Sequence, residues 1–164
     1  MIPVIGLTRT FSRPASARPF LGLALCILAS GMMVTKAAAN TPEAEAQALN
    51  RAYETGASFE RSPVEMFTML LCSALWNHWD TIVSRSTDSK FTGSLRPELS
   101  SSHAKKRKIY LERMARREMD EEDDAGEFTD TQASAQSMAD EVYEAYSSGR
   151  KSGKEDLVGW LGEC

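Results

Sequence analysis

The stretch CSALWNHWD, residues 72–80, gathers the side chains of this sequence that are best suited to chemistry. Cysteine, histidine and aspartate are the residue types that serve as nucleophile, general base and orienting group in hydrolytic sites. His78 and Asp80 are two residues apart, however, and on a helix such residues point about 200° from one another. They cannot form a direct pair, so His78 is predicted to be a histidine of the core or of its rim.

Other catalytic and metal-binding patterns are weak. A zinc site needs about three or four ligands, and the spacing of His78, His103 and the cysteines is not typical of one. No G-x-S-x-G turn presents a serine, and SGRKSGKED lacks the spacing of a phosphate-binding loop. We predict no catalytic residue, no cofactor and no metal. An enzyme with a site near His78 is kept as an alternative.

The first 39 residues are typical of a targeting segment because they contain basic but no acidic side chains. Three arginines precede an apolar run, PFLGLALCILASGMMV, at residues 19–34. This run is shorter than the roughly 20 residues that span a bilayer, and Ala37-x-Ala39 fits a signal-peptide cleavage site. We predict a signal peptide over residues 1–39, cleaved after Ala39, and a periplasmic or extracellular protein.

Two other interpretations of this segment remain open. An uncleaved segment would anchor the protein, making it a membrane-tethered adaptor that touches the membrane only through its N-terminus. The opening TRTFSRPASARPF also has the composition of a mitochondrial transit peptide, although the continuous apolar run argues against it. Lipid modification of Cys26 is disfavoured because bulky Leu25 precedes it.

Cleavage would leave residues 40–164, a single helical domain of 125 residues with room for one core. Because the lost charges are all basic, 15 lysines and arginines would then face 23 acidic residues, a net charge of −8. This charge disfavours nonspecific binding to nucleic acid. Cys72 and Cys164 would remain, and in an oxidising compartment they are predicted to form a disulfide.

The segment from residue 63 to about 84 is predicted to be the central helix. Its start signal, SPVE, is a capping box with Ser62 as the N-cap. Apolar side chains cover most of the helix circumference, which indicates burial on nearly all sides. The remaining polar side chains form one stripe at spacings of three and four: Ser73, Asn77, Asp80 and Ser84.

Further helix signals predict an all-α fold, a small bundle of four to five helices around the central one. They indicate a helix from Thr41 to Gly56, a long helix from residue 97 or 102 to about 122, a helix from its cap Asp130 to Gly149, and a last one that starts at the capping box SGKE, residues 152–155. Residues 86–102 are predicted to form a loop and residues 120–129 an acidic linker. Trp160 is expected to help dock the last helix.

Two places are predicted to contact a partner. Trp76 borders the polar stripe, where an indole often closes a groove, so the first candidate site combines Trp76, Asn77 and Asp80. The second is the basic run AKKRK, whose candidates are Lys105, Lys106, Arg107 and Lys108. Such a run suits anionic lipid, nucleic acid or an acidic partner. The absence of interleaved aromatic residues argues against nucleic acid.

Simpler explanations exist for both places, namely core packing of Trp76 and a solvated face at the basic run. The function that these features predict is that of a small exported, non-enzymatic binding or accessory module with an unknown protein partner.

Overall fold

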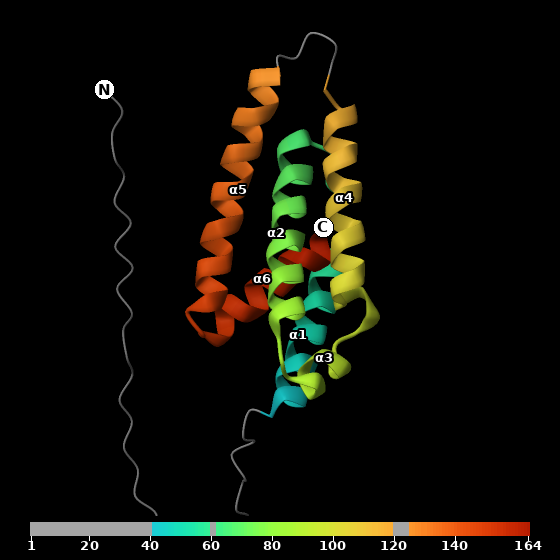
Figure 1. Cartoon of the computed structure of the whole chain (residues 1–164), viewed down its shortest axis with the longest axis vertical. Coiled ribbons are helices and arrows are strands. Elements are labelled where there is room, and N and C mark those ends of the chain that lie inside the picture. The colour runs from blue at the N-terminus through green and yellow to red at the C-terminus, as the bar shows by residue number, and fades with distance from the viewer. Residues whose placement is uncertain (1–40, 60–61, 120–124) are drawn as a thin grey trace, which may run out of the picture. The chain divides into compact units, whose positions relative to one another are not determined.

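The computed structural model describes residues 41–59, 62–119 and 125–164, all within the compact unit Lys36–Cys164. These residues form six α-helices and one short 3-10 helix, with no strand among them (Figure 1). The all-α prediction is therefore confirmed. The predicted signal peptide, the alternative anchor at residues 19–34 and residues 120–124 of the predicted linker lie outside the described residues. Within the described ranges, no helix has the length and apolar character needed to cross a membrane.

The central helix is α2, Met66–Arg85, as its apolar circumference predicted. It packs against α4 (Ser101–Arg117), α5 (Ala125–Ser147) and α6 (Lys151–Glu163). Figure 1 shows α4 and α5 along opposite sides of α2. Ten of its twenty residues are buried, because neighbouring helices cover most of its circumference.

The predicted start of α2 is wrong by three residues. Glu65 occupies the N-cap position with an extended backbone, and no side chain caps the helix there. Residues 62–65 instead line a hollow together with Trp160 and Cys164, beside the C-terminal end of α6. The local capping signal is therefore not used, and Ser62 is not a cap.

Helices α1 (Pro42–Ala57) and α4 both start at side-chain caps. Thr41 Oγ1 accepts a hydrogen bond from the amide of Ala44 at 3.2 Å, which confirms the predicted start of α1. Ser100 Oγ accepts from the amide of His103 at 3.3 Å and caps α4. Each cap satisfies one of the amide groups that a first helical turn leaves without a partner.

Close packing of α1 on α6 depends on glycine. A Cβ added at Gly56 would overlap the backbone carbonyl of Gly159, and one added at Gly162 would overlap the carbonyl oxygen of Tyr53. Because glycine has no Cβ, the two helix backbones can approach each other at these points. α1 packs mainly on α6 and α3, while α2 packs on α4 and α5.

The predicted loop at residues 86–102 contains two short helices, so that prediction is wrong in part. α3 spans Ser89–Ser94, where the Asp88 carboxylate accepts hydrogen bonds from two amides of the first turn. A 3-10 helix, η1, follows at Pro97–Leu99. Phe91 and Leu99 are buried, which anchors the segment to the core.

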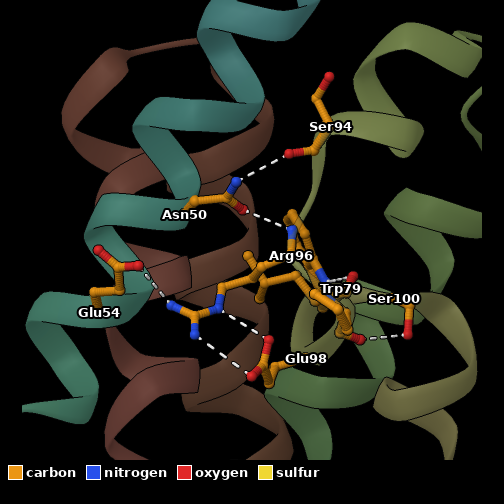
Figure 2. A network of polar contacts seen from close by, with 9 residues as sticks. Asn50, Glu54, Trp79, Ser94, Arg96, Glu98 and Ser100 are labelled. Atoms are coloured by element: carbon orange, nitrogen blue, oxygen red, sulfur yellow. Dashed lines mark hydrogen bonds and ion pairs between the residues drawn. The ribbon is translucent and has the colours of Figure 1, made fainter.

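A polar network ties this segment to α1 (Figure 2). The Asn50 side chain donates to the carbonyl oxygen of Ser94 at 2.9 Å and accepts from the amide of Arg96 at 3.0 Å. The Arg96 guanidinium pairs with Glu98 at 3.0 Å and with Glu54 at 2.9 Å. Side chains of α1 thus supply partners to backbone groups that no regular helix satisfies.

Two further boundaries differ from the sequence prediction. α4 ends at Arg117 rather than near residue 122, since acidic residues follow where the helix dipole disfavours them. α5 begins at Ala125, within the predicted linker, and Asp130 lies inside the helix instead of capping it. The buried Phe128, whose ring lies 4.5 Å from the Arg116 guanidinium, secures these earlier turns.

The turn between α5 and α6 agrees with the prediction in part. Gly149 has a φ of 74° and ends α5, a left-handed conformation that favours glycine. α6 starts at Lys151 without a side-chain cap, so the SGKE capping box is not used. Gly153 is buried against the backbone of Ala145, where a Cβ would overlap a carbonyl oxygen. Packing of α6 on α5 therefore decides where α6 begins.

Cys72 and Cys164 lie at disulfide distance, as predicted, with their sulfur atoms 2.07 Å apart. The pair joins the middle of α2 to the residue that follows α6, and the two positions are 92 residues apart in the chain. Both cysteines are buried. A bonded pair of this kind fits an oxidising compartment.

Candidate functional site

The two predicted candidate sites meet each other in the structure, because the polar stripe of α2 packs on α4. Lys108 Nζ donates to Asn77 Oδ1 at 2.9 Å. Asp80 Oδ1 accepts from Ser101 Oγ at 2.6 Å and lies 3.9 Å from Lys105 Nζ. We call these five residues the polar seam. These contacts join α2 to α4.

Trp76 does not border a groove, which corrects the prediction. Its side chain is 1% exposed, because α1 and α4 cover the side of α2 on which it lies. Its ring lies 6.5 Å from that of Tyr53 and 5.7 Å from that of His103, centroid to centroid. Its indole Nε1 is buried and has no hydrogen-bond partner among the described residues. Trp76 is therefore a core residue.

The side chains of the basic run differ in their contacts with the rest of the bundle. Lys105 and Lys108 belong to the polar seam, and Arg107 donates to the carbonyl oxygen of Cys164. Lys106 is exposed and forms no ion pair within the described part of the chain. Lys106 is therefore the cation of the run that no described contact engages, although the Lys105 side chain is also 60% exposed.

Lys106 belongs to a larger exposed surface that the sequence analysis missed. The α4 basic face, as we call it, lines a shallow hollow and consists of Lys106, Ile109, Tyr110, Arg113, Met114 and Arg117. Ile109 is 47% exposed and Tyr110 is 52% exposed. Arg113 and Arg117 have no acidic partner among the described residues. The spacing of three and four residues was the signal that could have revealed this face.

A groove between α1, α5 and α6 is a second surface that the sequence analysis missed. Its volume is about 720 Å³. Its large apolar lining residues are Phe59, Val142 and Trp160, and its charged ones are Arg51, Glu141, Glu155, Asp156 and Glu163. We call it the Trp160 groove. Four carboxylates against one guanidinium make its lining acidic.

Trp160 is exposed on the surface of α6, which corrects the expectation that it docks the helix. Its side chain is 40% exposed, whereas Leu157, Val158 and Leu161 are buried and hold α6 on the bundle. Phe59, at the edge of the same groove, is 56% exposed. Two aromatic side chains thus face solvent in an acidic groove.

His78 forms a cluster with α5 rather than with Asp80. Its Nε2 lies 2.7 Å from Asp140 Oδ1, which also accepts a hydrogen bond from Gln136 Nε2 at 2.7 Å. The ring of Tyr143 stacks on the imidazole at 4.5 Å between centroids. A hydrogen bond from Gln136, and to a smaller extent one from His78, lowers the pKa of Asp140. This cluster joins α2 to α5.

The described residues contain no group of three or more histidine, cysteine or acidic side chains that could hold a metal ion. Cys72 is bonded to Cys164, so its sulfur is not a free nucleophile. Comparisons with family models, with curated proteins and with solved structures found no match to this chain. A function must therefore be inferred from the two surfaces themselves.

Proposed function

We propose that this chain is an exported, non-enzymatic binding module whose Trp160 groove receives a cationic, apolar segment of a protein partner. The observation that carries the proposal is the position of Trp160, an exposed indole in a groove with four acidic side chains. Tryptophan is enriched among the residues that dominate the energy of protein interfaces.

The apolar part of the groove supports this role. Phe59 and Trp160 expose large aromatic surface to water, and burying such surface contributes about 25 cal/mol for each Å² removed from solvent. Trp160 also lines the neighbouring hollow, which includes the exposed Val64 and the bonded Cys164. The apolar surface therefore continues past the groove on both sides of one indole ring.

The charges of the groove indicate which charge the partner carries. Glu155 lies 3.6 Å from Lys151 Nζ, whereas Glu141, Asp156 and Glu163 pair with no basic side chain among the described residues. Unpaired carboxylates beside aromatic rings favour a partner that presents both positive charge and apolar surface. Attraction between such charges is screened by salt, so binding should weaken as ionic strength rises.

Export rests on two independent features. Residues 1–39 have the composition of a signal peptide, and Cys72 and Cys164 lie at disulfide distance. Both features suit a periplasmic or extracellular protein. The mass of the protein recovered from its own cells tests this part: it should correspond to residues 40–164 without free thiols, and a full-length mass with free thiols would contradict export.

The groove is tested with a labelled amphipathic peptide of lysine and leucine, whose binding to the purified protein is followed by fluorescence anisotropy. We expect Trp160→Ala to weaken binding about tenfold or more, because it removes the aromatic anchor. Phe67→Ala is the matched control, since Phe67 is exposed but does not line the groove. A peptide with glutamate in place of lysine should not bind. Equal affinity of the wild type and Trp160→Ala would refute the groove as the site.

A further inference from the structure

The Trp160 groove and the α4 basic face carry matching patterns of opposite charge. Along α6, the groove presents the sequence acid, aromatic, acid at Asp156, Trp160 and Glu163. Along α4, the basic face presents base, apolar, base at Lys106, Tyr110 and Arg113. In both helices the central residue is four positions after the first and three before the last.

This agreement has a geometric consequence. Two helical residues seven positions apart are separated by about 10.5 Å along the axis and lie on nearly the same face. The Cα atoms of Asp156 and Glu163 therefore have the same axial separation as those of Lys106 and Arg113. Two such helices laid side by side can form both ion pairs at once, with the apolar side chains between them.

We propose that the cationic, apolar segment bound by the Trp160 groove is the α4 basic face of a second copy of this chain. This inference rests on the proposed function of the groove. The exposed apolar side chains Ile109 and Tyr110 of one copy would cover Trp160 and Phe59 of the next. Each of these side chains is at least 40% exposed in the single chain, so both surfaces lose apolar area to solvent on contact.

Within one chain the groove and the basic face belong to different helices. α4 is fixed on α2 by the polar seam, through the Ser101–Asp80 and Lys108–Asn77 hydrogen bonds. The residues that line the groove and those of the basic face have no member in common. A contact between two different surfaces is heterologous, so each added copy leaves one groove and one basic face free. Association therefore continues beyond the dimer unless a ring closes.

The experiment uses two variants of the full protein, each with one surface disabled. The groove variant carries Trp160→Ala and Asp156→Asn, and the face variant carries Tyr110→Ala and Arg113→Gln. All four side chains are exposed, so the substitutions are expected to leave the fold intact. Circular dichroism checks that each variant is folded. Sedimentation velocity then measures the size of each species as concentration and salt are varied.

We expect the wild type to form species larger than a monomer that dissociate in high salt, and each variant alone to be monomeric at the same concentration. An equimolar mixture should form a heterodimer and nothing larger, because one intact groove and one intact face remain between the two variants. A monomeric wild type, a groove variant that still associates, or a mixture that stays monomeric would each overturn the proposal.

The peptide experiment separates this failure from failure of the groove itself. If the wild type is monomeric but binds the lysine and leucine peptide in a manner that Trp160→Ala abolishes, the groove stands and the second copy is the wrong occupant. If the peptide also fails to bind, both proposals fall.

Discussion

The indole N–H of Trp79 donates a hydrogen bond to the carbonyl oxygen of Leu99 at 2.8 Å, and both residues are fully buried. Trp79 belongs to α2 and Leu99 to η1, so this bond attaches the segment before α4 to the central helix. Trp76, one turn earlier, has an equally buried indole whose N–H has no partner among the described residues.

The two tryptophans form a matched pair for mutation. Trp79→Phe should lower the free energy of unfolding by about 1–2 kcal/mol more than Trp76→Phe does, because it leaves the buried Leu99 carbonyl without a donor. Both changes remove similar ring area, so the loss of packing largely cancels in the comparison. Urea unfolding followed by circular dichroism measures the difference. Equal losses would show that the Trp79 hydrogen bond contributes nothing measurable.

Gly56 should resist substitution, although alanine normally stabilises a helix relative to glycine. A Cβ at Gly56 would overlap the Gly159 backbone, so Gly56→Ala is expected to cost about 1–3 kcal/mol through displacement of α6. Gly93→Ala in α3 is the control, since nothing lies within 4 Å of a Cβ there. The control should be neutral or gain up to about 1 kcal/mol. Thermal or urea midpoints that move in the same direction for both variants would contradict the close approach of α1 and α6.

Reduction of the Cys72–Cys164 bond should destabilise the fold. The bond closes a loop over a sequence separation of 92 residues, and the chain-entropy model gives about 4.6 kcal/mol for such a loop. Urea unfolding with and without a reductant measures the effect, and the double variant Cys72→Ser, Cys164→Ser should behave like the reduced protein. An unfolding midpoint that is the same in both redox states would show that the bond adds no stability.

Asp140 should contribute to stability only above acidic pH. Its pKa in the folded protein lies below the ordinary value of 3.8, because Gln136 and His78 donate hydrogen bonds to the carboxylate. The stabilisation is therefore complete above that ordinary value and is lost as the pH falls through the folded-state pKa. Asp140→Asn should lower the urea midpoint at about pH 6, and the difference from wild type should shrink as the pH falls below the ordinary value of 3.8.

Asp130→Asn on the same helix is the control for that series, since the Asp130 carboxylate is exposed and has no hydrogen-bond partner within the described ranges. A gap between wild type and Asp140→Asn that persists unchanged in acid would mean that the contacts of the carboxylate are not what the substitution removes.

Much of the fold was predictable because it depends on local periodicity. The apolar circumference of α2 predicted a central helix, and Thr41 and Gly149 marked helix ends that the structure confirms. At these helix ends the local sequence signal and the packing of the helix agree, so the predicted boundary was right. The capping box at Ser62 failed: the helix starts three residues later, and residues 62–65 line a hollow shared with Trp160 and Cys164, which are distant in the sequence.

The candidate site was less predictable, because it depends on which polar side chains the fold turns inward. Asn77 and Asp80 are of the types that bind partners, yet α4 supplies their partners: Lys108 donates to Asn77 and Ser101 donates to Asp80. Trp160 was expected to dock α6, but its smaller apolar neighbours do so and leave the indole in solvent. No spacing rule distinguishes these outcomes until the packing of α4 and α6 is known.

Binding in the groove is tested most directly by the three indole N–H signals in a nitrogen–proton correlation spectrum. Trp160 is exposed in the groove, while Trp76 and Trp79 are buried and serve as internal references. Addition of the lysine and leucine peptide should shift the Trp160 indole signal progressively and leave the signals of Trp76 and Trp79 in place. A Trp160 signal that does not move while the peptide is bound would contradict the groove as the binding site.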